Sequence, residues 1–511
     1  MRRHAVAAGG SALLLLLAGC SGNSGAPSPA APTVTVPTAP PAAAAASLGP
    51  TGPSTAKPCH GVAIPLGADP QKLIDAHPAG TTFCFAKGTH RISKPIHPRD
   101  GDTLGGGEGV VLTGSVQLTG WQHDGDHWVV RGVLPTSYEL KSQWKCEDDN
   151  TKPCRLGEQV FVDGKHLNRV MSRDQLKPGT FFGDYQANAV YVADDPTHSS
   201  VEMSKTTTAI DKTANNVTVT GLTIEHFASK PQAGAVQVGP GWKVTANEVR
   251  WNHAVGIMVI QGDRAELSRN TVADNGQLGI GQYRSEGVRI TQNLVTRNNT
   301  DGFWIADWEA GGIKSTRSSG EVSGNDIVAN RGVGMWSDIA EHGRRIAGNR
   351  IRDNAADGIR YEISYQAVIE QNVVESNGFG TGRNSGGSLW DGGGINVNTS
   401  SQVEVRGNLV KDNRNGISIQ SRTRGQGPRG LYVLADVVVE GNLVVMDDST
   451  ASTGVVENER SPTRDGAVIF RRNSYQLGEG GNAEDRFAFK GKTLSWNQWQ
   501  QAGFDQDSIK S

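Results

Sequence analysis

The 511-residue sequence has little excess charge, few aromatic residues and few cysteines. Lysine plus arginine number 50 and aspartate plus glutamate 52, so the formal net charge is −2, which excludes a polybasic nucleic-acid binder and an acidic-tail protein. Apolar residues make up 36% and aromatic residues 6%, which is little for one compact core of this length. Glycine is abundant instead, with 65 residues, but no Gly-X-Y period marks a collagen. This composition indicates an elongated, turn-rich β structure with a thin core.

The first 20 residues resemble a bacterial lipoprotein signal peptide. Two arginines precede an apolar run over residues 5–17 that is too short to span a bilayer. The run leads into Leu-Ala-Gly-Cys at residues 17–20, which resembles a lipobox and implies that Cys20 is lipidated and becomes the new N-terminus. An ordinary cleaved signal that happens to carry Cys20 is the alternative. No other segment is long and apolar enough to cross a membrane, so we expect an extracytoplasmic chain held at the cell surface by its lipid alone.

Residues 21–57 consist almost wholly of Pro, Ala, Ser, Thr and Gly. Such a composition buries too little apolar surface to order itself. We therefore predict a disordered tether over 21–57.

The four remaining cysteines are even in number, which favours disulfides in an exported chain. Cys146–Cys154 would close a short polar loop, and Cys59–Cys84 would pin the start of the fold. A zinc site is the alternative, although the spacings lack a paired C-x-x-C pattern.

An internal repeat runs through the second half of the chain. Its unit is Asn-x-(Val/Ile)-x-x-Asn, and successive starts lie 23, 23, 32, 24, 23, 36 and 34 residues apart. A basic unit near 23 residues therefore carries insertions in three places. Each unit also holds two short alternating segments, one before the first asparagine and one that begins at a glycine. The repeat starts at Asn247, Asn270, Asn293, Asn325, Asn349, Asn372, Asn408 and Asn442.

Three short strands in such a unit form one coil of a right-handed parallel β-helix, in which strands of neighbouring coils lie about 4.8 Å apart. Stacking in register places each side chain above its equivalent in the next coil. The turn asparagines should therefore bond the backbone and one another in ladders. We interpret them as structural, because they recur in every coil.

With this repeat, the chain resembles the secreted bacterial β-helix proteins of the pectate-lyase-like superfamily. Residues 79–92 look like the opening coil of that group, residues 160–181 like a β-rich insertion, and residues 493–499 like a closing segment. Each open end of a solenoid needs a cap, because a free strand edge recruits other chains. We expect a signal peptide over 1–20, the tether over 21–57, an N-terminal cap with first coil and β-rich insertion over 58–210, the β-helix core over 211–460 and a closing segment over 461–511.

Aligning the glycine-led strands separates an inward from an outward face. The first and third positions after the glycine are mostly apolar, so the second and fourth should face outward. Asp338 and Glu362 share one outward position on neighbouring coils, and their carboxyls should lie about 5 Å apart. The other outward residues of interest are Trp304, Trp336, Arg360, Asn396 and Asn398.

Two insertions flank these coils, as loops that wall a cleft would. The first permits two registers: if Gly302 leads the strand, Trp304 faces outward, and if Gly312 leads it, Lys314 does. Either register places Glu309 and Lys314 near Asp338. The second insertion projects Trp390 and Asp391 next to the same column.

This mixture of residue types is typical of a carbohydrate site, since aromatic rings stack on sugars, amides bind hydroxyls and carboxylates perform acid–base chemistry. Singly, each has a plainer explanation: the tryptophans could cover each other, Arg360 could be an ion-pair partner, and Asp391 could shape a turn. Jointly they predict a site. The predicted catalytic residues are Asp338, Glu362, Glu309, Lys314 and Arg360, and the predicted substrate-binding residues are Trp304, Trp336, Trp390, Asp391, Asn396 and Asn398.

Our first hypothesis is a surface-tethered, monomeric carbohydrate-active enzyme that acts as a glycoside hydrolase on an acidic or complex polysaccharide or on a cell-wall glycan. Asp338 with Glu362 would suit a retaining mechanism, and pairing either with Glu309 would suit inversion. A polysaccharide lyase is the alternative, with Lys314 or Arg360 as base or neutraliser of a uronic acid. No cofactor is expected, and calcium lacks a dense aspartate cluster to hold it. A non-catalytic envelope glycan-binding protein, or a structural one, is the alternative of another class.

Overall fold

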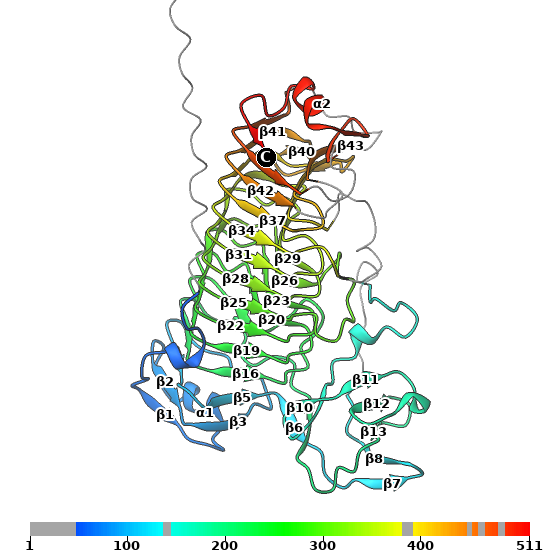
Figure 1. The fold of residues 1–511 in the computed structure, drawn as a ribbon. Coiled ribbons are helices and arrows are strands. Elements are labelled where there is room, and N and C mark those ends of the chain that lie inside the picture. Colours follow the sequence, from blue (N-terminus) through cyan, green and yellow to red (C-terminus); the bar gives the residue numbers. More distant parts are fainter. Residues whose placement is uncertain (1–47, 136–144, 381–391, 447–451, 458–465, 479–485) are drawn as a thin grey trace, which may run out of the picture. The chain divides into compact units, whose positions relative to one another are not determined.

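The computed structural model describes residues 48–135, 145–380, 392–446, 452–457, 466–478 and 486–511. Within these residues the chain winds into stacked coils, and each coil supplies one strand to each of three long sheets, which we name sheets A, B and C (Figure 1). Neighbouring strands pair in parallel, apart from the final pair of sheet C, which is antiparallel. No helix among the described residues is long and apolar enough to cross a membrane.

Sheet A begins each coil. Its inward side chains form an apolar column, in which Val219, Val244, Leu267 and Ile290 lie in register and are fully buried. The strands of sheet A, in spatial order, are β1 (Val62–Ile64), β2 (Thr82–Phe85), β4 (Thr103–Gly105), β15 (Thr218–Thr220), β18 (Lys243–Thr245), β21 (Glu266–Ser268), β24 (Val288–Thr291), β27 (Gly320–Ser323), β30 (Arg344–Ala347), β33 (Tyr365–Glu370), β36 (Ser401–Arg406), β41 (Ala435–Glu440) and β44 (Val468–Arg471).

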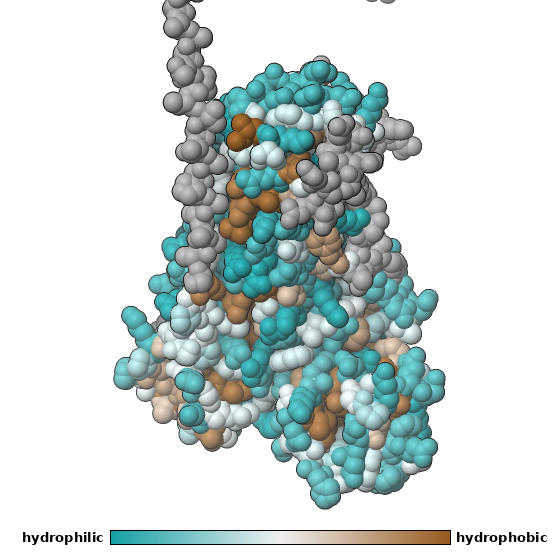
Figure 2. Space-filling view, viewed as in Figure 1, coloured by the Kyte–Doolittle hydropathy of each residue, from teal (hydrophilic) through white to brown (hydrophobic). Residues whose placement is uncertain are grey.

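Sheet B follows the first ladder asparagine of each coil. It consists of β3 (Gly88–Arg91), β5 (Val110–Thr113), β16 (Thr223–Glu225), β19 (Glu248–Arg250), β22 (Thr271–Ala273), β25 (Leu294–Thr296), β28 (Asp326–Val328), β31 (Arg350–Arg352), β34 (Val373–Glu375), β37 (Leu409–Lys411), β42 (Leu443–Met446), β45 (Ser474–Leu477) and β48 (Ile509–Lys510). Figure 2 shows mainly hydrophilic side chains on the face it presents, with apolar side chains gathered over the upper coils, where β42 and β37 lie in Figure 1.

Sheet C is formed by the glycine-led strands and carries the predicted site. It consists of β17 (Gly234–Val238), β20 (Val255–Ile260), β23 (Leu278–Tyr283), β26 (Gly311–Thr316), β29 (Val333–Asp338), β32 (Ile359–Glu362), β35 (Ile395–Asn398), β38 (Ile417–Ser421), β43 (Thr453–Glu457), β46 (Phe487–Phe489) and β47 (Lys492–Leu494).

The predicted asparagine ladders are confirmed. Asn270 donates from Nδ2 to the Val244 carbonyl at 2.8 Å and to Asn293 Oδ1 at 2.9 Å, and Asn293 Oδ1 also accepts from the Asn270 backbone N–H. One ladder continues in this way to Asn473, and a second joins Asn252 to Asn413. The left-handed backbone of these turns belongs to the residue before each asparagine, such as Arg269 at φ 56°, and not to the asparagine itself.

The repeated glycine of sheet C is required by close packing beside the ladder. A Cβ on Gly312 would lie 2.6 Å from the Gly334 carbonyl oxygen of the next coil and 3.0 Å from Asn330 Nδ2. No side chain fits there unless a coil shifts. The glycine therefore marks a point of close contact between successive coils beside the asparagine ladder, which explains its regular distance from the asparagine.

A β-rich insertion leaves the coils between β5 and β15 and packs around its own apolar core (Figure 1). It contains a four-stranded sheet, a five-stranded sheet and two 3-10 helices, η2 (Pro153–Arg155) and η3 (Arg173–Gln175). The first sheet consists of β10 (Lys165–His166), β9 (Val160–Val162), β14 (Val201–Ser204) and β6 (Ser115–Gln117), and the second of β11 (Asn168–Val170), β12 (Thr180–Asp184), β13 (Ala189–Val192), β8 (His127–Arg131) and β7 (Gln122–Asp124).

Both expected disulfides are present, Cys59–Cys84 at the first coils and Cys146–Cys154 in the insertion. Helix α1 (Pro70–Asp75) covers the first coils with the buried Ile74, and helix α2 (Trp496–Gln501) covers the last with the buried Trp499. Strands β44, β45 and β46 show that coils continue into the range expected to close the molecule.

The C-terminal end of the expected tether is ordered against the coils. Residues 48–57 are described, include the 3-10 helix η1 (Pro53–Thr55), and bond to sheet B and its preceding turn. The Gly52 N–H donates to the Arg269 carbonyl at 2.9 Å, and the Thr51 and Thr271 hydroxyls lie 2.8 Å apart. The prediction of disorder is therefore wrong for this stretch, because backbone hydrogen bonds to a neighbouring coil need no large apolar side chain.

Candidate functional site

The register of sheet C decides between the two alignments that the sequence allowed. Gly311 pairs with Val333 and Lys314 with Trp336, so Gly312 leads strand β26. Lys314 consequently takes the outward position for which Trp304 was the other candidate. The same column continues through Arg360 and Asn396.

Asp338 and Glu362 occupy one outward position on neighbouring coils, as their shared offset predicted. Trp336 pairs with Arg360 and Ser337 with Tyr361, and the next residues along β29 and β32 are Asp338 and Glu362. Strands at this pairing lie about 4.8 Å apart, which fixes the separation of the two backbones.

The side chains of this column line one cavity of about 440 Å³. Strand residues form its floor, the loop before β26 forms one wall, and the segment after β38 forms another. The lining residues are Asp307, Trp308, Glu309, Lys314, Trp336, Asp338, Ile339, Arg360, Glu362, Ile363, Asn396, Asn398, Arg422 and Arg424. Seven of the predicted residues on β26 to β35 thus converge with Glu309 on one place.

Asp338 is held between a cation and two acids. Its Oδ2 lies 3.4 Å from the Lys314 ammonium, which also lies 3.3 Å from Glu309 Oε1 and donates to the Trp308 carbonyl at 3.0 Å. Burial raises the pKa of Asp338 to about 6, with Lys314 opposing the rise and Glu362 and Glu309 adding to it. Asp338 therefore retains its proton into the mildly acidic range.

Glu362 lies in a different environment from Asp338. It forms an ion pair with Arg424, which reaches in from the segment after β38, and it accepts from Asn398 Nδ2 at 3.4 Å. A guanidinium and an amide thus both donate hydrogen bonds to this carboxylate. The two carboxyls of the pair thus differ in their partners.

Arg360 is held by two carboxylates that the sequence did not single out. Its Nη2 lies 2.5 Å from Asp307 Oδ1, and its Nε donates to Asp357 Oδ2 at 2.5 Å. These charges hold the pKa of Arg360 well above its ordinary value, although burial opposes them. Burial raises the pKa of Asp357 to about 6, and the positive charge of Arg360 opposes this rise.

Trp336 does not offer a free ring to a sugar. The Lys314 ammonium lies 3.5 Å from the ring centroid and the Arg360 guanidinium 4.8 Å away, and the residue is only 5% exposed. The two cations contact the indole, and the substrate-binding role of Trp336 stays a prediction. Trp336 keeps the two cations apart in the floor of the cavity.

Trp304 lies outside the column, contrary to the prediction. It belongs to the loop before β26, is 1% exposed, and packs with Phe303, Ala310 and the Cys146–Cys154 disulfide. Its backbone forms a bridge with Cys146. The sequence pattern was misleading here, because both Gly302, in the loop, and Gly312, in strand β26, fitted the position of the repeat glycine. Trp390 and Asp391 fall outside the described residues.

Residues that the sequence did not reveal complete the cavity. Asp357 stands directly before a repeat glycine, where the equivalent coils have Val255, Leu278 and Val333, so a charged residue at an apolar position was the available signal. Asp307 and Trp308 lie in an aperiodic loop, and Arg422 and Arg424 follow a strand end. These last four carry no periodic signal.

The family model described as "Right handed beta helix region" matches residues 233–393. The chain folds as a right-handed parallel β-helix.

The chain is similar to several solved structures at low sequence identity. A complex of XylC with xylose is 16% identical, with a TM-score of 0.62, over 86% of this chain and 82% of that one. The A-module of the mannuronan C-5 epimerase AlgE4 of Azotobacter vinelandii is 13% identical, with a TM-score of 0.45, over 86% and 94%. The catalytic domain of a GH87 alpha-1,3-glucanase is 11% identical, with a TM-score of 0.46, over 91% and 70%. No curated protein matches the sequence.

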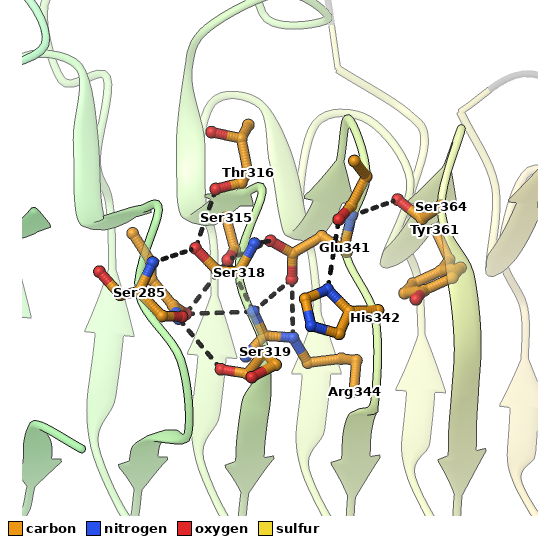
Figure 3. Close-up of polar contacts among 12 residues, drawn as sticks. Ser285, Ser315, Thr316, Ser318, Ser319, Glu341, His342, Arg344, Tyr361 and Ser364 are labelled. Carbon is orange, nitrogen blue, oxygen red and sulfur yellow. Dashed lines mark hydrogen bonds and ion pairs between the residues drawn. The ribbon is translucent and has the colours of Figure 1, made fainter. Parts of the chain in front are cut away.

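A buried polar network backs the floor of the cavity. Ser315, which follows Lys314 in β26, points inward and donates to Glu341 Oε1 at 2.9 Å (Figure 3). Glu341 and Arg344 are fully buried, and Arg344 donates from Nε to Glu341 at 2.9 Å and from Nη2 to Ser315 at 2.7 Å. Arg344 takes the place that Ala367 and Val403 hold in later coils, and Glu341 takes the place of Ser318 and Ser364 in the neighbouring coils.

Another cavity, of about 310 Å³, lies against residues 48–51 and has Asp326 as its one lining carboxylate. It thus lacks the paired carboxylates of the sheet C cavity. Within the described part of the chain, no group of three or more His, Cys, Asp or Glu side chains is placed to hold a metal ion.

Proposed function

We propose that this chain is a carbohydrate-active enzyme that hydrolyses glycosidic bonds with Asp338 and Glu362. The observation that carries the proposal is the placement of these two carboxyls at one outward position of neighbouring coils in a single cavity. One strand spacing, about 4.8 Å, is close to the roughly 5–5.5 Å that retaining glycosidases use between their carboxyls. An inverting enzyme needs about 6.5–9.5 Å, to leave room for a water.

The two carboxyls are suited to different roles. Asp338, whose pKa is about 6, donates its proton to the leaving glycosidic oxygen. The Glu362 carboxylate, which is paired with Arg424, attacks the anomeric carbon and forms a glycosyl-enzyme ester as the bond to the leaving oxygen breaks. The Asp338 carboxylate then takes a proton from a water that hydrolyses the ester. The free carboxylate of Glu362 and the proton on Asp338 are thereby restored.

The lyase alternative is less well supported by the cations of the site. Arg360 is paired with Asp307 and Asp357, which raise its pKa and so disfavour its use as a base. Lys314 is close to three acceptors and bridges Glu309 to Asp338. Both cations position carboxylates in this arrangement.

The test is hydrolysis of aryl glycosides by purified wild type, Asp338→Asn, Asp338→Ala, Glu362→Gln and Glu362→Ala, with Glu404→Gln as a control of equal charge change on an exposed strand position. We expect each site variant to lower kcat/KM about 10²–10⁴-fold and the control to leave it unchanged. Added azide should restore turnover in both alanine variants. Glu362→Ala should form a glycosyl azide of inverted anomeric configuration, and Asp338→Ala should form a glycosyl azide of retained configuration.

Two outcomes would change the proposal. Inverted azide product from Asp338→Ala, and not from Glu362→Ala, would exchange the two roles. Failure of the wild type to cleave any glycoside or polysaccharide while it binds glycans would replace the enzyme with a glycan-binding protein.

We also propose that Cys20 carries a lipid that holds the chain on the outer side of the cytoplasmic membrane. Two disulfides support an oxidising compartment, where such bonds persist. In cells fed a labelled fatty acid, Cys20→Ser should lose the label and leave the membrane fraction. A variant that kept both would contradict the anchor.

A further inference from the structure

The ionised side chains that line the cavity balance one another. Four carboxyl groups and four cations face it, and the Asp357 carboxylate lies beneath Arg360. When Asp338 carries its proton as the general acid, Asp307, Glu309, Glu362 and Asp357 still offset the four cations, so the formal sum is 4 − 4 = 0. A site that recognises a carboxylate needs an excess of positive charge in this kind of poorly solvated space. Among the described residues the cavity has none. The lining acids are Asp307, Glu309, Asp338 and Glu362, and the lining cations are Lys314, Arg360, Arg422 and Arg424.

The central cations are also occupied. Lys314 has three N–H donors, and three acceptors surround it: Glu309, Asp338 and the Trp308 carbonyl. Arg360 is held between two carboxylates, and Arg424 is paired with Glu362. Arg422 donates from Nε and Nη2 to Gln420 Oε1. A sugar carboxylate at the floor would have to displace a buried partner and leave its charge uncompensated, which is costly.

The same ion pairs are well suited to hydroxyl groups. A hydroxyl donates one hydrogen bond and accepts others. It can therefore donate to the carboxylate and accept from the cation of one ion pair, without changing the net charge of the cavity. Asp307 with Arg360 and Glu309 with Lys314 present two such pairs side by side, and Gln232 orients Glu309 through a 2.9 Å bond. Asn396 and Asn398 add amides at the floor.

Trp308 supplies the exposed ring that Trp336 lacks. It lines the cavity next to Asp307 and Glu309 and is 43% exposed. An indole at the rim of a polar cavity can cover the apolar face of a sugar ring.

We propose that this cavity, acting as a glycosidase in the way proposed above, takes a neutral, hydroxyl-rich sugar residue and discriminates against a uronic acid. The Asp307–Arg360 and Glu309–Lys314 pairs bind its hydroxyls, and Trp308 covers its ring. The uronic acid considered for the lyase is thus the disfavoured substrate.

The test uses the purified full-length chain and matched pairs of 4-nitrophenyl glycosides that differ only at C6, namely glucoside with glucuronide and galactoside with galacturonide, in both anomers. We expect kcat/KM to be at least about 100-fold lower for each uronide than for its neutral partner. Equal or faster cleavage of a uronide would overturn this inference while leaving the hydrolase standing.

If the enzyme cleaves neither the neutral glycosides nor the uronides, the proposed hydrolase function is contradicted. The sugar preference is then tested by binding. Titration calorimetry with neutral and uronate oligosaccharides should give tighter binding of a neutral one. Tighter binding of the uronate would overturn the inference.

A charge variant tests the cause of the discrimination. Glu309→Gln removes one acid from the cavity and one partner from Lys314, so it should raise the ratio of uronide to neutral kcat/KM, or of the corresponding affinities, about tenfold. Glu404→Gln changes the net charge equally outside the cavity and should leave the ratio unchanged. An unchanged ratio in Glu309→Gln would show that charge balance does not set the preference.

Discussion

Three opposing contributions determine the ionisation of the Asp338 carboxyl. Removal from water disfavours its charged form and is the largest of them. The Lys314 ammonium at 3.4 Å favours the charge, whereas Glu362 and Glu309 oppose it. The resulting pKa of about 6 lies where a general acid is both protonated and able to donate. Neighbouring charges of both signs therefore tune one group.

A pair of variants should move this pKa in opposite directions. Lys314→Met removes the positive charge and raises the pKa of Asp338, so the basic limb of the kcat/KM profile should move to higher pH, by roughly one unit. Glu309→Gln removes a negative charge, so the same limb should move to lower pH. Initial rates of aryl glycoside hydrolysis from pH 4 to 9 would show both shifts. Limbs that move in the same direction, or not at all, would exclude Asp338 as the acid.

At the scale of elements, the loop between β25 and β26 builds one wall of the cavity. It brings Asp307, Trp308 and Glu309 to the ends of Arg360 and Lys314. The Cys146–Cys154 loop of the β-rich insertion lies behind it, since the Glu147 N–H donates to the Phe303 carbonyl at 2.8 Å. The Cys146–Cys154 disulfide, which precedes this loop by about 150 residues, thus packs against the wall that contributes Asp307 and Glu309 to the site.

The strands of sheet C were predictable from sequence, whereas the loops were not. A strand alternates with a period of two residues, and the repeat glycine fixes its phase, so Asp338, Arg360 and Glu362 could be placed on one face. A loop has neither constraint. The position of Trp304 beside a disulfide and the ion pair of Arg424 with Glu362 depend on tertiary contacts that no local pattern encodes.

At the scale of the whole molecule, each coil is stabilised mainly by the coil on either side of it. The asparagine ladders run through the stack. At the C-terminal end, Asn473 of the first ladder donates from Nδ2 to Asp505 Oδ1 of the cap at 2.9 Å. Asp505 Oδ2 also accepts from Tyr475 and from Trp499 Nε1. The cap thus ends the ladder with an acceptor, and helix α2 covers the final coil.

Replacing Trp499 should uncap the stack from one end. The indole is fully buried, lies 4.3 Å from the Phe504 ring and donates to Asp505 at 2.9 Å. Trp499→Ala removes all of these contacts and should cost about 3–5 kcal/mol. Trp499→Phe keeps the stacking and should cost about 1 kcal/mol, because Asp505 loses one of its donors and keeps Tyr475 and Asn473. Since coils depend on their neighbours, hydrogen exchange should accelerate in β44 and β45 while β20 to β26 keep their protection. Equal acceleration in every coil would mean that the solenoid unfolds as one unit, and the end coils would then have no separate dependence on the cap.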